Sequence, residues 1–329
     1  MTADFHVAVT ATGCYTPEHV MDNAELIRHL GLDTTPEWIE SRTGVQSRHW
    51  MTDDQTTSDM AVEAARRIIA ERGVRPEELD RIILATSSPD FPSPATATIV
   101  GRKLGSRCPA FDISAACAGF LYALDLGAAS VRNGDSKVLV LAADARSRFV
   151  DKSDRRTAAL FADGAGGVLL EPSTEPGLLS IQIGSEGQEH LGAHIPAGGA
   201  SLPTSAETVA QGHHFLVVDE YREIYDNFIR FTREACDQAL TRAGLLWDDV
   251  DTFITHQGNA RIVENVAKDL GLREAQVVNQ IHQHGNTSAA TVPIALTESL
   301  SNGRIQPGDT VLLTAVGAGY TYGAAVVRF

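Results

Sequence analysis

The sequence predicts an α/β protein built from two similar halves, each with a mostly parallel sheet covered by helices. Short apolar runs of strand length alternate with segments of helical spacing along the chain. The order helix, strand, helix, strand, helix, strand occurs twice, and short βα units of this kind build parallel sheets with helices on both faces. With 329 residues, of which 43% are hydrophobic, the chain can bury a large core. We therefore expect one pseudo-symmetric body with halves at 1–172 and 173–329.

The first half begins with a strand at 6–14, where apolar residues alternate. A helix capped by Asp22 follows to about residue 29, and a second helical turn holds Trp38 and Arg42. Beyond these, the spacing of apolar residues predicts three further helices and three strands. The helices are expected at 61–72, 95–104 and 118–131, and the strands at 79–87, 109–113 and 137–143.

Two glycine-containing stretches lie on either side of the expected boundary between the halves. Residues 161–170 are expected to form a strand pair that a tight turn at Asp163-Gly-Ala-Gly-Gly167 interrupts. A phosphate-binding loop is the weaker interpretation, because no helix with Lys-Ser or Lys-Thr follows. Residues 184–210 are rich in Gly, Ser, Pro and Thr without periodicity, which predicts an extended surface excursion.

The pattern of the first half returns from about residue 221. Aligning 61–73 with 232–244 places Ala64 over Ala235 and Gly73 over Gly244. The strands that follow correspond as well, and they are expected at 250–255, 275–281 and 311–314. The period is far too long for a solenoid, so we expect the halves to pack together, with a site where their strand ends meet.

Composition and charge limit the classes of function. The formal net charge is −15 and the isoelectric point is near 5.1. Nucleic acid is therefore not an expected partner, since phosphate binding needs a basic face. An acidic carrier protein would also be repelled overall, so docking it would require a local patch of Arg and Lys.

The chain carries no sign of a membrane or of an oxidising compartment. No apolar run approaches the roughly 20 residues of a membrane span, and residues 1–6 lack a basic region followed by an apolar one. The four cysteines form neither a CxxC pair nor a disulfide framework. We expect a cytoplasmic protein without a bound metal.

Cys117 is the first candidate for chemistry. It lies where the apolar run 109–113 turns into the helical segment 118–131. Unpaired N–H groups and the positive end of the helix dipole at such a position favour the thiolate, which is the nucleophilic form. Taken alone, the motif is equally consistent with a buried cysteine that only fills space between small neighbours.

The second half supplies polar side chains after its own strands. One expected strand end precedes His256 and another precedes Asn286. Cys117 as a thiolate would attack a thioester and hold the acyl group. A neutral imidazole and a carboxamide can then donate hydrogen bonds to an enolate oxygen without burying an uncompensated charge. His282 and His284 remain alternatives to His256, and Asn286 beside a glycine is also typical of a turn.

These motifs resemble those of the β-ketoacyl-[acyl-carrier-protein] synthase III family of the thiolase superfamily. The resemblance covers nearly the whole chain, and it rests on Phe111-Asp-Ile-Ser-Ala-Ala-Cys-Ala-Gly-Phe, His256-Gln-Gly-Asn, Gly285-Asn-Thr-Ser-Ala-Ala and the ending from Gly317 to Phe329. It implies the thiolase fold, a five-layered α-β-α-β-α body. It also implies a homodimer that uses acyl-coenzyme A and acyl carrier protein as substrates and has no permanently bound cofactor.

By the same resemblance, Cys117 is the acylated nucleophile, and His256 and Asn286 serve decarboxylation and enolate stabilisation. The oxyanion hole of the acyl-enzyme corresponds to the backbone N–H groups of Cys117 and Ala318. Phe91 matches a residue that enters the acyl pocket of the partner subunit.

The resemblance also implies two binding surfaces. The residues that would contact coenzyme A and its pantetheine arm are Trp38, Arg42, Arg155 and Asn259. In such a surface an indole can stack on a base and a guanidinium can bind phosphate. Arg261 and Lys268 would dock the carrier protein, although Asp269 stands where a second lysine is common.

The segment 211–233 departs from the family pattern. Most members carry a glycine followed by a Val-Phe-Lys run, whereas this chain has a longer, acidic and aromatic stretch. Because the segment borders the tunnel entrance in the family, it predicts an altered acyl or donor preference. We therefore expect an acyltransferase that forms a carbon–carbon bond by Claisen condensation through acyl-Cys117, in a polyketide or other secondary pathway. The alternatives are the enzyme that primes fatty-acid synthesis from acyl-coenzyme A and malonyl-carrier protein, a relative that joins two carrier-bound β-ketoacyl chains or acylates oxygen, and a non-catalytic acyl-thioester-binding module.

Overall fold

Two sheets with corresponding strand orders, one of five strands and one of four, form the centre of the protein. The computed structural model describes residues 5–189, 191–218 and 221–329. Across the first sheet the order is β1 (His6–Tyr15), β7 (Asp163–Ser173), β6 (Val138–Ala145), β4 (Arg81–Ala85) and β5 (Ala110–Ile113). Across the second it is β8 (Leu178–Ser185), β13 (Thr321–Arg328), β12 (Thr310–Gly317) and β11 (Thr252–Thr255). In each sheet the first two neighbouring pairs are antiparallel and the others are parallel.

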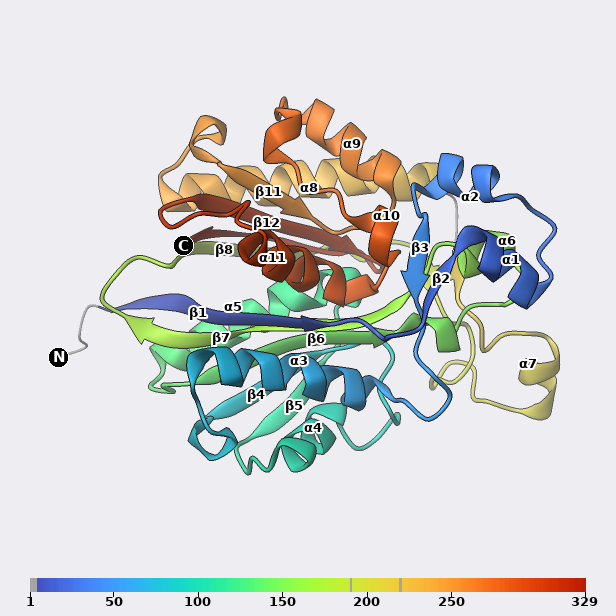
Figure 1. The fold of residues 1–329 in the computed structure, drawn as a ribbon, viewed down its shortest axis with the longest axis horizontal. Coiled ribbons are helices and arrows are strands. Elements are labelled where there is room, and N and C mark those ends of the chain that lie inside the picture. Colours follow the sequence, from blue (N-terminus) through green and yellow to red (C-terminus); the bar gives the residue numbers. More distant parts are fainter. Residues whose placement is uncertain (1–4, 190, 219–220) are drawn as a thin grey trace.

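The longer helices form three layers around these sheets (Figure 1). The outer face of the first sheet is covered by α3 (Thr57–Arg72) and α4 (Thr96–Leu104), and that of the second by α8 (Tyr221–Ala243) and α9 (Ala260–Asp269). Between the sheets lie α5 (Gly119–Arg132) and α11 (Thr291–Ser301). One hydrophobic cluster joins both central helices to both sheets. The expected five-layered α-β-α-β-α arrangement is therefore confirmed.

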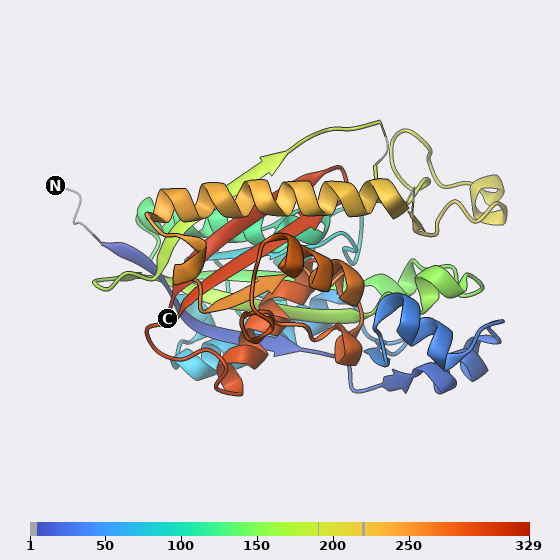
Figure 2. The same ribbon diagram turned by 90° about the horizontal axis from the view of Figure 1, so that it is seen from above.

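Most of the short elements gather at the right-hand end of Figure 1, toward which the carboxyl ends of β4, β5 and β6 point. They are β2 (Val20–Asp22), α1 (Asn23–Leu30), α2 (Pro36–Thr43), β3 (Ser47–His49), α6 (Arg155–Ala158), β9 (Ala193–His194), α7 (Ala206–Ala210), β10 (Val217–Val218) and α10 (Ile281–His284). The side chains of Asp22 and Thr35 accept backbone N–H groups and so begin α1 and α2. Figure 2 shows that α8 runs along the molecule and has its first turns at this end.

The strand β7 corrects one expectation. A strand pair with a tight turn at 163–167 is wrong, because a single strand runs through these residues. The glycines remove side chains where neighbouring elements come close. A Cβ atom at Gly167 would overlap the carbonyl oxygen of Val140 in β6, and one at Gly166 would lie 3.0 Å from the backbone nitrogen of Ile294 in α11. The glycine run therefore serves close packing within the sheet and against α11.

The third strand of the second half is reduced to a single bridge. The expected strand at 275–281 is wrong, since a 3-10 turn, one parallel bridge from Val277 to Phe253 and the start of α10 occupy these residues. A side chain replaces part of the missing ladder, because Gln257 donates to the carbonyl of Val278 at 3.1 Å. Val277 nevertheless lies beside β11 as β5 lies beside β4, so both halves keep the same topology.

Candidate active site

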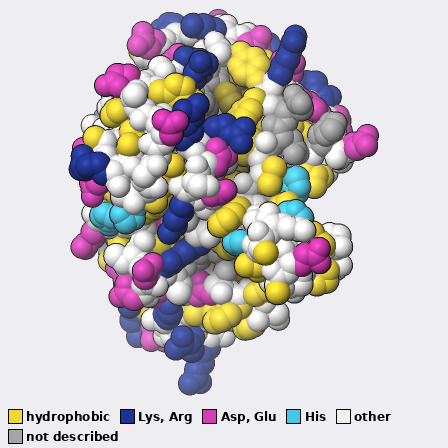
Figure 3. All heavy atoms as spheres, turned by 90° about the vertical axis from the view of Figure 1, so that its right-hand side faces the viewer, with side chains coloured by type: hydrophobic (Ala, Val, Ile, Leu, Met, Phe, Trp, Pro, Cys, Tyr) yellow, Lys and Arg dark blue, Asp and Glu magenta, His cyan; other side chains and the backbone are white. Residues whose placement is uncertain are grey.

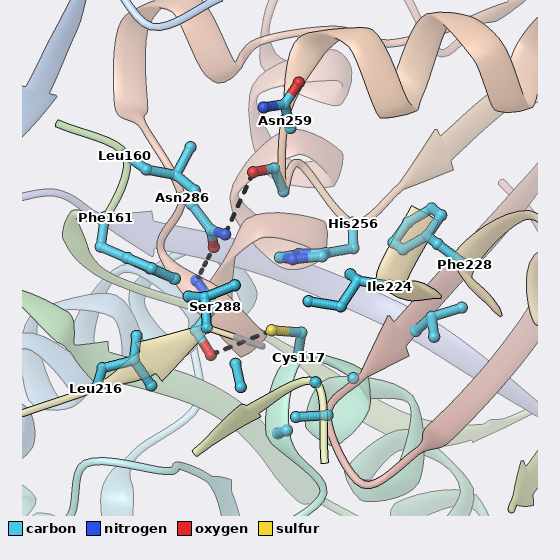
Figure 4. A pocket seen from close by; sticks show the side chains of 18 of the residues that line it. Cys117, Leu160, Phe161, Leu216, Ile224, Phe228, His256, Asn259, Asn286 and Ser288 are labelled. Atoms are coloured by element: carbon cyan, nitrogen blue, oxygen red, sulfur yellow. Dashed lines mark hydrogen bonds between the residues drawn. The ribbon is translucent and has the colours of Figure 1, made fainter. Parts of the chain in front are cut away.

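A cavity of about 360 Å³ is lined by Cys117, His256 and Asn286. These side chains come from both halves of the fold, as the repeat predicts. In Figure 4 the imidazole of His256 and the amide of Asn286 point toward each other above the Cys117 sulfur. Figure 3 shows the end of the molecule to which the first sheet's parallel strands point, with a hollow rimmed by hydrophobic and histidine side chains and with Lys and Arg on the same face.

Cys117 lies in a strained turn that has a counterpart in the second half. The 3-10 turn Ala116–Ala118 joins β5 to α5, and Ala116 has a φ of 45°. The turn Ser288–Ala290 precedes α11 in the same way, and Ser288 has a φ of 55°. Positive φ values are unfavourable for residues with a Cβ atom. The two turns are in contact, and the Cys117 sulfur lies 3.7 Å from the Ser288 hydroxyl oxygen.

Burial raises the pKa of the Cys117 thiol, while the hydrogen bond with Ser288 and the charge of Arg146 act in the opposite direction. Burial therefore opposes the expected preference for the thiolate, which stays a prediction. The 3-10 turn acts in the same direction as burial, because the N–H groups of Ala118 and Gly119 already bond to carbonyl groups within the turn. They are not available to stabilise a charge on the sulfur.

His256 follows β11, and only 4% of its surface is exposed. Its Nδ1 lies 2.7 Å from the hydroxyl oxygen of Thr291, which also bonds to the carbonyl of Ser288 at 3.0 Å. A carbonyl oxygen only accepts, so the hydroxyl donates to it and accepts from the ring. We therefore assign the proton of the neutral imidazole to Nδ1. Burial lowers the pKa of His256 to about 4, so the ring is neutral at pH 7.

Gly258 leaves space beside the other ring nitrogen. A Cβ atom at this position would lie 2.9 Å from Nε2 of His256. The Gly258 carbonyl accepts from Nδ2 of Asn286 at 3.4 Å, while Oδ1 of Asn286 accepts from the Ser288 N–H at 2.9 Å. These two bonds fix the orientation of the amide. Because an amide nitrogen has two hydrogens, Asn286 can donate a further bond into the cavity.

The two rival histidines lie elsewhere. Nε2 of His284 pairs with Glu298 at 2.9 Å, and its ring stacks on His49 with centroids 5.5 Å apart. His282 lies in α10, and neither of the two lines the cavity that holds Cys117. The geometry therefore selects His256 among the three candidates.

The residues expected to contact coenzyme A lie on α2, α6 and the start of α9. The guanidinium of Arg155 covers the Trp38 ring, 4.5 Å from its centroid, and donates to the carbonyl of Asp33. Asn259 caps α9, and its Nδ2 donates to the carbonyl of Arg42 at 3.0 Å, which links α9 to α2. Of the four expected contacts, only Asn259 lines the cavity itself.

Ala318 lines the cavity immediately after β12. Its neighbour Gly317 allows this close approach, since a Cβ atom there would lie 2.8 Å from the backbone nitrogen of Cys117. The remaining expected site residues lie on the surface: Phe91, which is 56% exposed between β4 and α4, and Arg261 and Lys268, which are exposed on α9.

Several residues that line the cavity were not predicted from the sequence. Ser288 could have been found by aligning the two turns that precede the central helices. The first turns of α8 place Tyr221, Ile224 and Phe228 along the cavity, but the sequence marked only their segment as unusual. Arg146 also lines the cavity, and no motif around it signalled this position.

The described part of the chain contains no group of three or more His, Cys, Asp and Glu side chains placed to hold a metal ion. All four cysteines are free thiols: Cys14, Cys108, Cys117 and Cys236. Within the same ranges, no helix combines the length and the apolar composition that crossing a membrane requires.

Known proteins share this fold and these motifs. The family model for 3-oxoacyl-[acyl-carrier-protein] synthase III matches residues 111–187, and the model for the C-terminal part of that synthase matches residues 240–329. A β-ketoacyl-[acyl-carrier-protein] synthase III from Symbiobacterium thermophilum is 41% identical over 326 residues, which cover 98% of each chain. The chain belongs to the β-ketoacyl-[acyl-carrier-protein] synthase III family.

Solved structures similar to this synthase III agree with the assignment. The 3-oxoacyl-[acyl-carrier-protein] synthase III of Aquifex aeolicus superposes with a TM-score of 0.89 at 36% identity, covering 98% of this chain and 100% of that one. The priming β-ketosynthase of the R1128 polyketide pathway superposes with a TM-score of 0.90 at 32% identity, covering 98% and 96%. The protein is therefore an acyl-transferring condensing enzyme with the thiolase fold.

Proposed function

We propose that this enzyme joins two acyl thioesters by Claisen condensation through an acyl group on Cys117. The convergence of Cys117, His256 and Asn286 on one cavity carries the proposal. In the first step the Cys117 sulfur bonds to the carbonyl carbon of the donor thioester, the bond from that carbon to the donor sulfur breaks, and the donor leaves as a thiol. The N–H groups of Cys117 and Ala318 bind the oxyanion of this step.

His256 and Asn286 act in the second step. A malonyl thioester loses carbon dioxide and leaves an enolate, whose carbon attacks the acyl carbon and releases the Cys117 sulfur. Asn286 donates from Nδ2 to the enolate oxygen. His256 donates from Nε2 in the tautomer in which the Thr291 hydroxyl donates to Nδ1 instead of to the Ser288 carbonyl.

The same proposal covers carriers and assembly. Coenzyme A binds at Trp38, Arg42, Arg155 and Asn259. An acidic carrier protein docks on Arg261 and Lys268, which are exposed on α9 and attract it locally although the chain carries a net charge of −15. The exposed ring of Phe91 contacts a second copy of the chain in a cytoplasmic homodimer. The proposed boundary between residues 172 and 173 lies at the end of β7.

For the pathway we propose polyketide or other secondary metabolism, because the altered segment supplies Tyr221, Ile224 and Phe228 to the cavity. The similarity to the R1128 priming ketosynthase also supports this assignment. Initiation of fatty-acid synthesis is the second candidate, and the 41% identity to the Symbiobacterium thermophilum synthase favours it.

Intact-protein mass spectrometry with acyl-coenzyme A and acyl-carrier donors tests the function. We expect a stable acyl adduct in the wild type and none in Cys117→Ala. His256→Ala and Asn286→Ala should still take up acyl groups, but each should condense them with a malonyl thioester about 100-fold more slowly. If both variants fail to take up acyl groups, the division of roles is wrong. No adduct with any donor would favour the non-catalytic binding module.

A further inference from the structure

Arg146 is a buried cation inside the reaction cavity. It is the first residue of the 3-10 turn Arg146–Arg148 after β6, and only 6% of its surface is exposed. It lines the same cavity as Cys117, but the condensation described above does not use it. A buried guanidinium is unfavourable without hydrogen-bonding partners of opposite charge, so its burial in the cavity indicates a bound group.

Protein groups satisfy only one side of this guanidinium. Nη1 donates to the hydroxyl of Ser87 at 3.1 Å, and the group lies 5.6 Å from the centroid of the Phe161 ring. Nε is buried and has no hydrogen-bond partner in the part of the chain that the structure describes. No carboxylate of those residues forms a salt bridge with Arg146. Among the described residues, the edge of the guanidinium that carries Nε is therefore without a partner.

Asp144 lies two residues earlier on β6, but its oxygens are already occupied. Oδ1 accepts from the N–H and the hydroxyl of Ser87 at 2.8 and 3.0 Å and from the Ser88 hydroxyl at 2.8 Å. Oδ2 accepts from the N–H of Ala289 at 3.1 Å. The Ser87 hydroxyl thus connects Asp144 to Arg146 without a direct contact between the two charges.

The strand ends indicate which substrate Arg146 faces. Ser87, Cys117 and Arg146 follow β4, β5 and β6, three parallel strands whose carboxyl ends share one edge of the first sheet. His256 and Asn286, which we assign to the enolate, belong to the second half. The positive charge of Arg146 also acts on the sulfur, where it opposes the rise in the pKa of Cys117 that burial causes. The acyl chain carried on Cys117 is therefore the substrate group beside Arg146.

We propose that the acyl group accepted by Cys117 ends in a carboxylate, which binds the unpaired edge of Arg146. The planar fork of a guanidinium matches a carboxylate through two parallel hydrogen bonds. The donor is then the thioester of a short dicarboxylic acid, because a cavity of about 360 Å³ must also admit the pantetheine arm. The carboxylate takes no part in the bond changes: the acyl carbon bonds to Cys117, its bond to the donor sulfur breaks, and the donor thiol leaves. This inference rests on the proposed acyl-Cys117 step.

The rate of self-acylation by two matched donors tests the proposal. Succinyl-coenzyme A carries a terminal carboxylate, and 4-methylvaleryl-coenzyme A replaces it with an uncharged group of similar shape. We expect the wild type to accept the succinyl donor about 100-fold faster, because the uncharged donor leaves a buried cation unpaired. In Arg146→Met, which keeps the length of the side chain without its charge, the ratio of the two rates should fall to about 1 or below.

Arg148→Met is the matched control, since this nearby arginine contacts Asp53 and Thr52 at the surface and should leave the ratio unchanged. Equal or faster acylation of the wild type by the uncharged donor would overturn the inference and leave the proposed function intact. The comparison of the two donors uses the wild-type protein alone, so it does not depend on whether a variant folds. If Arg146→Met slows both donors equally, Arg146 acts on the sulfur and the dicarboxylic assignment is wrong. If no thioester of any kind gives an adduct, the proposed function fails first.

Discussion

The hydroxyl of Thr291 decides which nitrogen of His256 can donate to a substrate. It lies between Nδ1 of His256 and the carbonyl of Ser288, so its rotation selects the tautomer of the ring. Thr291→Val removes the hydroxyl that hydrogen-bonds to Nδ1 of His256, so neither tautomer of the ring is stabilised. Condensation should slow about tenfold or more, while Cys117 still accepts an acyl group. Thr291→Ser keeps the hydroxyl and should restore most of the rate. Separate measurement of adduct formation and of condensation distinguishes the two steps, and equal losses in both variants would indicate a packing effect instead.

Burial of His256 also links its protonation to folding. Its pKa is lowered to about 4, against 6.5 for an exposed histidine. Between these values the unfolded chain binds a proton that the folded chain does not, so stability falls as the pH falls through this window. Above pH 6.5 the burial of His256 does not reduce the free energy of unfolding. At pH 4 it lowers that free energy by about 3 kcal/mol.

Urea unfolding of the wild type and His256→Gln at about pH 7.5 and about pH 4.5 measures this contribution. The wild type should lose more of its free energy of unfolding than the variant does. Asp163, whose pKa burial raises to about 6, stabilises the fold as the pH falls, but it does so in both proteins and cancels in the comparison. Equal losses would show that His256 is readily protonated in the folded protein.

Among the elements, β7 depends on glycines that have no side chain where other backbone segments come close. Gly167→Ala would place a methyl group against the Val140 carbonyl, which the backbone of β6 cannot avoid without moving. We expect a loss of about 1–3 kcal/mol in the free energy of unfolding. Gly187→Ala is the control, because no atom lies within 4 Å of its added methyl group, and it should change stability by less than about 0.5 kcal/mol. Similar stabilities for the two variants, measured by urea unfolding, would contradict this account of β7.

The helix α8 shows how an unequal repeat creates a site. Its counterpart α3 has 16 residues, whereas α8 has 23. The first turns of α8 carry Tyr221, Ile224 and Phe228 to the cavity, while its later turns pack on the second sheet as α3 packs on the first. The departure between residues 211 and 233 therefore changes the cavity wall without disturbing the repeat. Glu220, which also belongs to that segment, lies outside the described residues.

At the scale of the whole molecule, the charge of −15 and the basic side chains of α9 make opposite contributions to carrier docking. Arg261→Gln and Lys268→Gln should each raise the KM for a carrier-bound donor about threefold or more at low salt, because local attraction has to overcome global repulsion. The kinetics with coenzyme A donors should change little. Arg75→Gln is the control, since Arg75 precedes the start of β4, whereas the cavity residue Ser87 follows the end of that strand. An equal effect in that variant, or on coenzyme A donors, would place the docking surface elsewhere.

The layered fold and the three convergent side chains could be predicted because both depend on patterns that the chain repeats. Apolar spacing identifies the helices, and the alignment of 61–73 with 232–244 assigns the second half to the architecture of the first. Topology then brings His256 to the cavity of Cys117. The failures share one physical cause, since each depends on atoms that are distant in the chain. The glycines of β7 resemble a turn until α11 is placed against them, and 275–281 resembles a strand until Gln257 takes over its hydrogen bonds.

The sequence by itself therefore determined the two halves, the family and the residues Cys117, His256 and Asn286, because periodicity, caps and motifs are local properties of the chain. Only the tertiary structure decided the state of those residues. Burial lowers the pKa of His256 and raises that of Cys117, and Thr291 orients the imidazole. Packing likewise leaves the Nε edge of Arg146 without a partner among the described residues, and Arg146 lines the cavity that holds the sulfur. Burial and hydrogen bonding arise between segments far apart in the chain, so no single stretch of sequence specifies them.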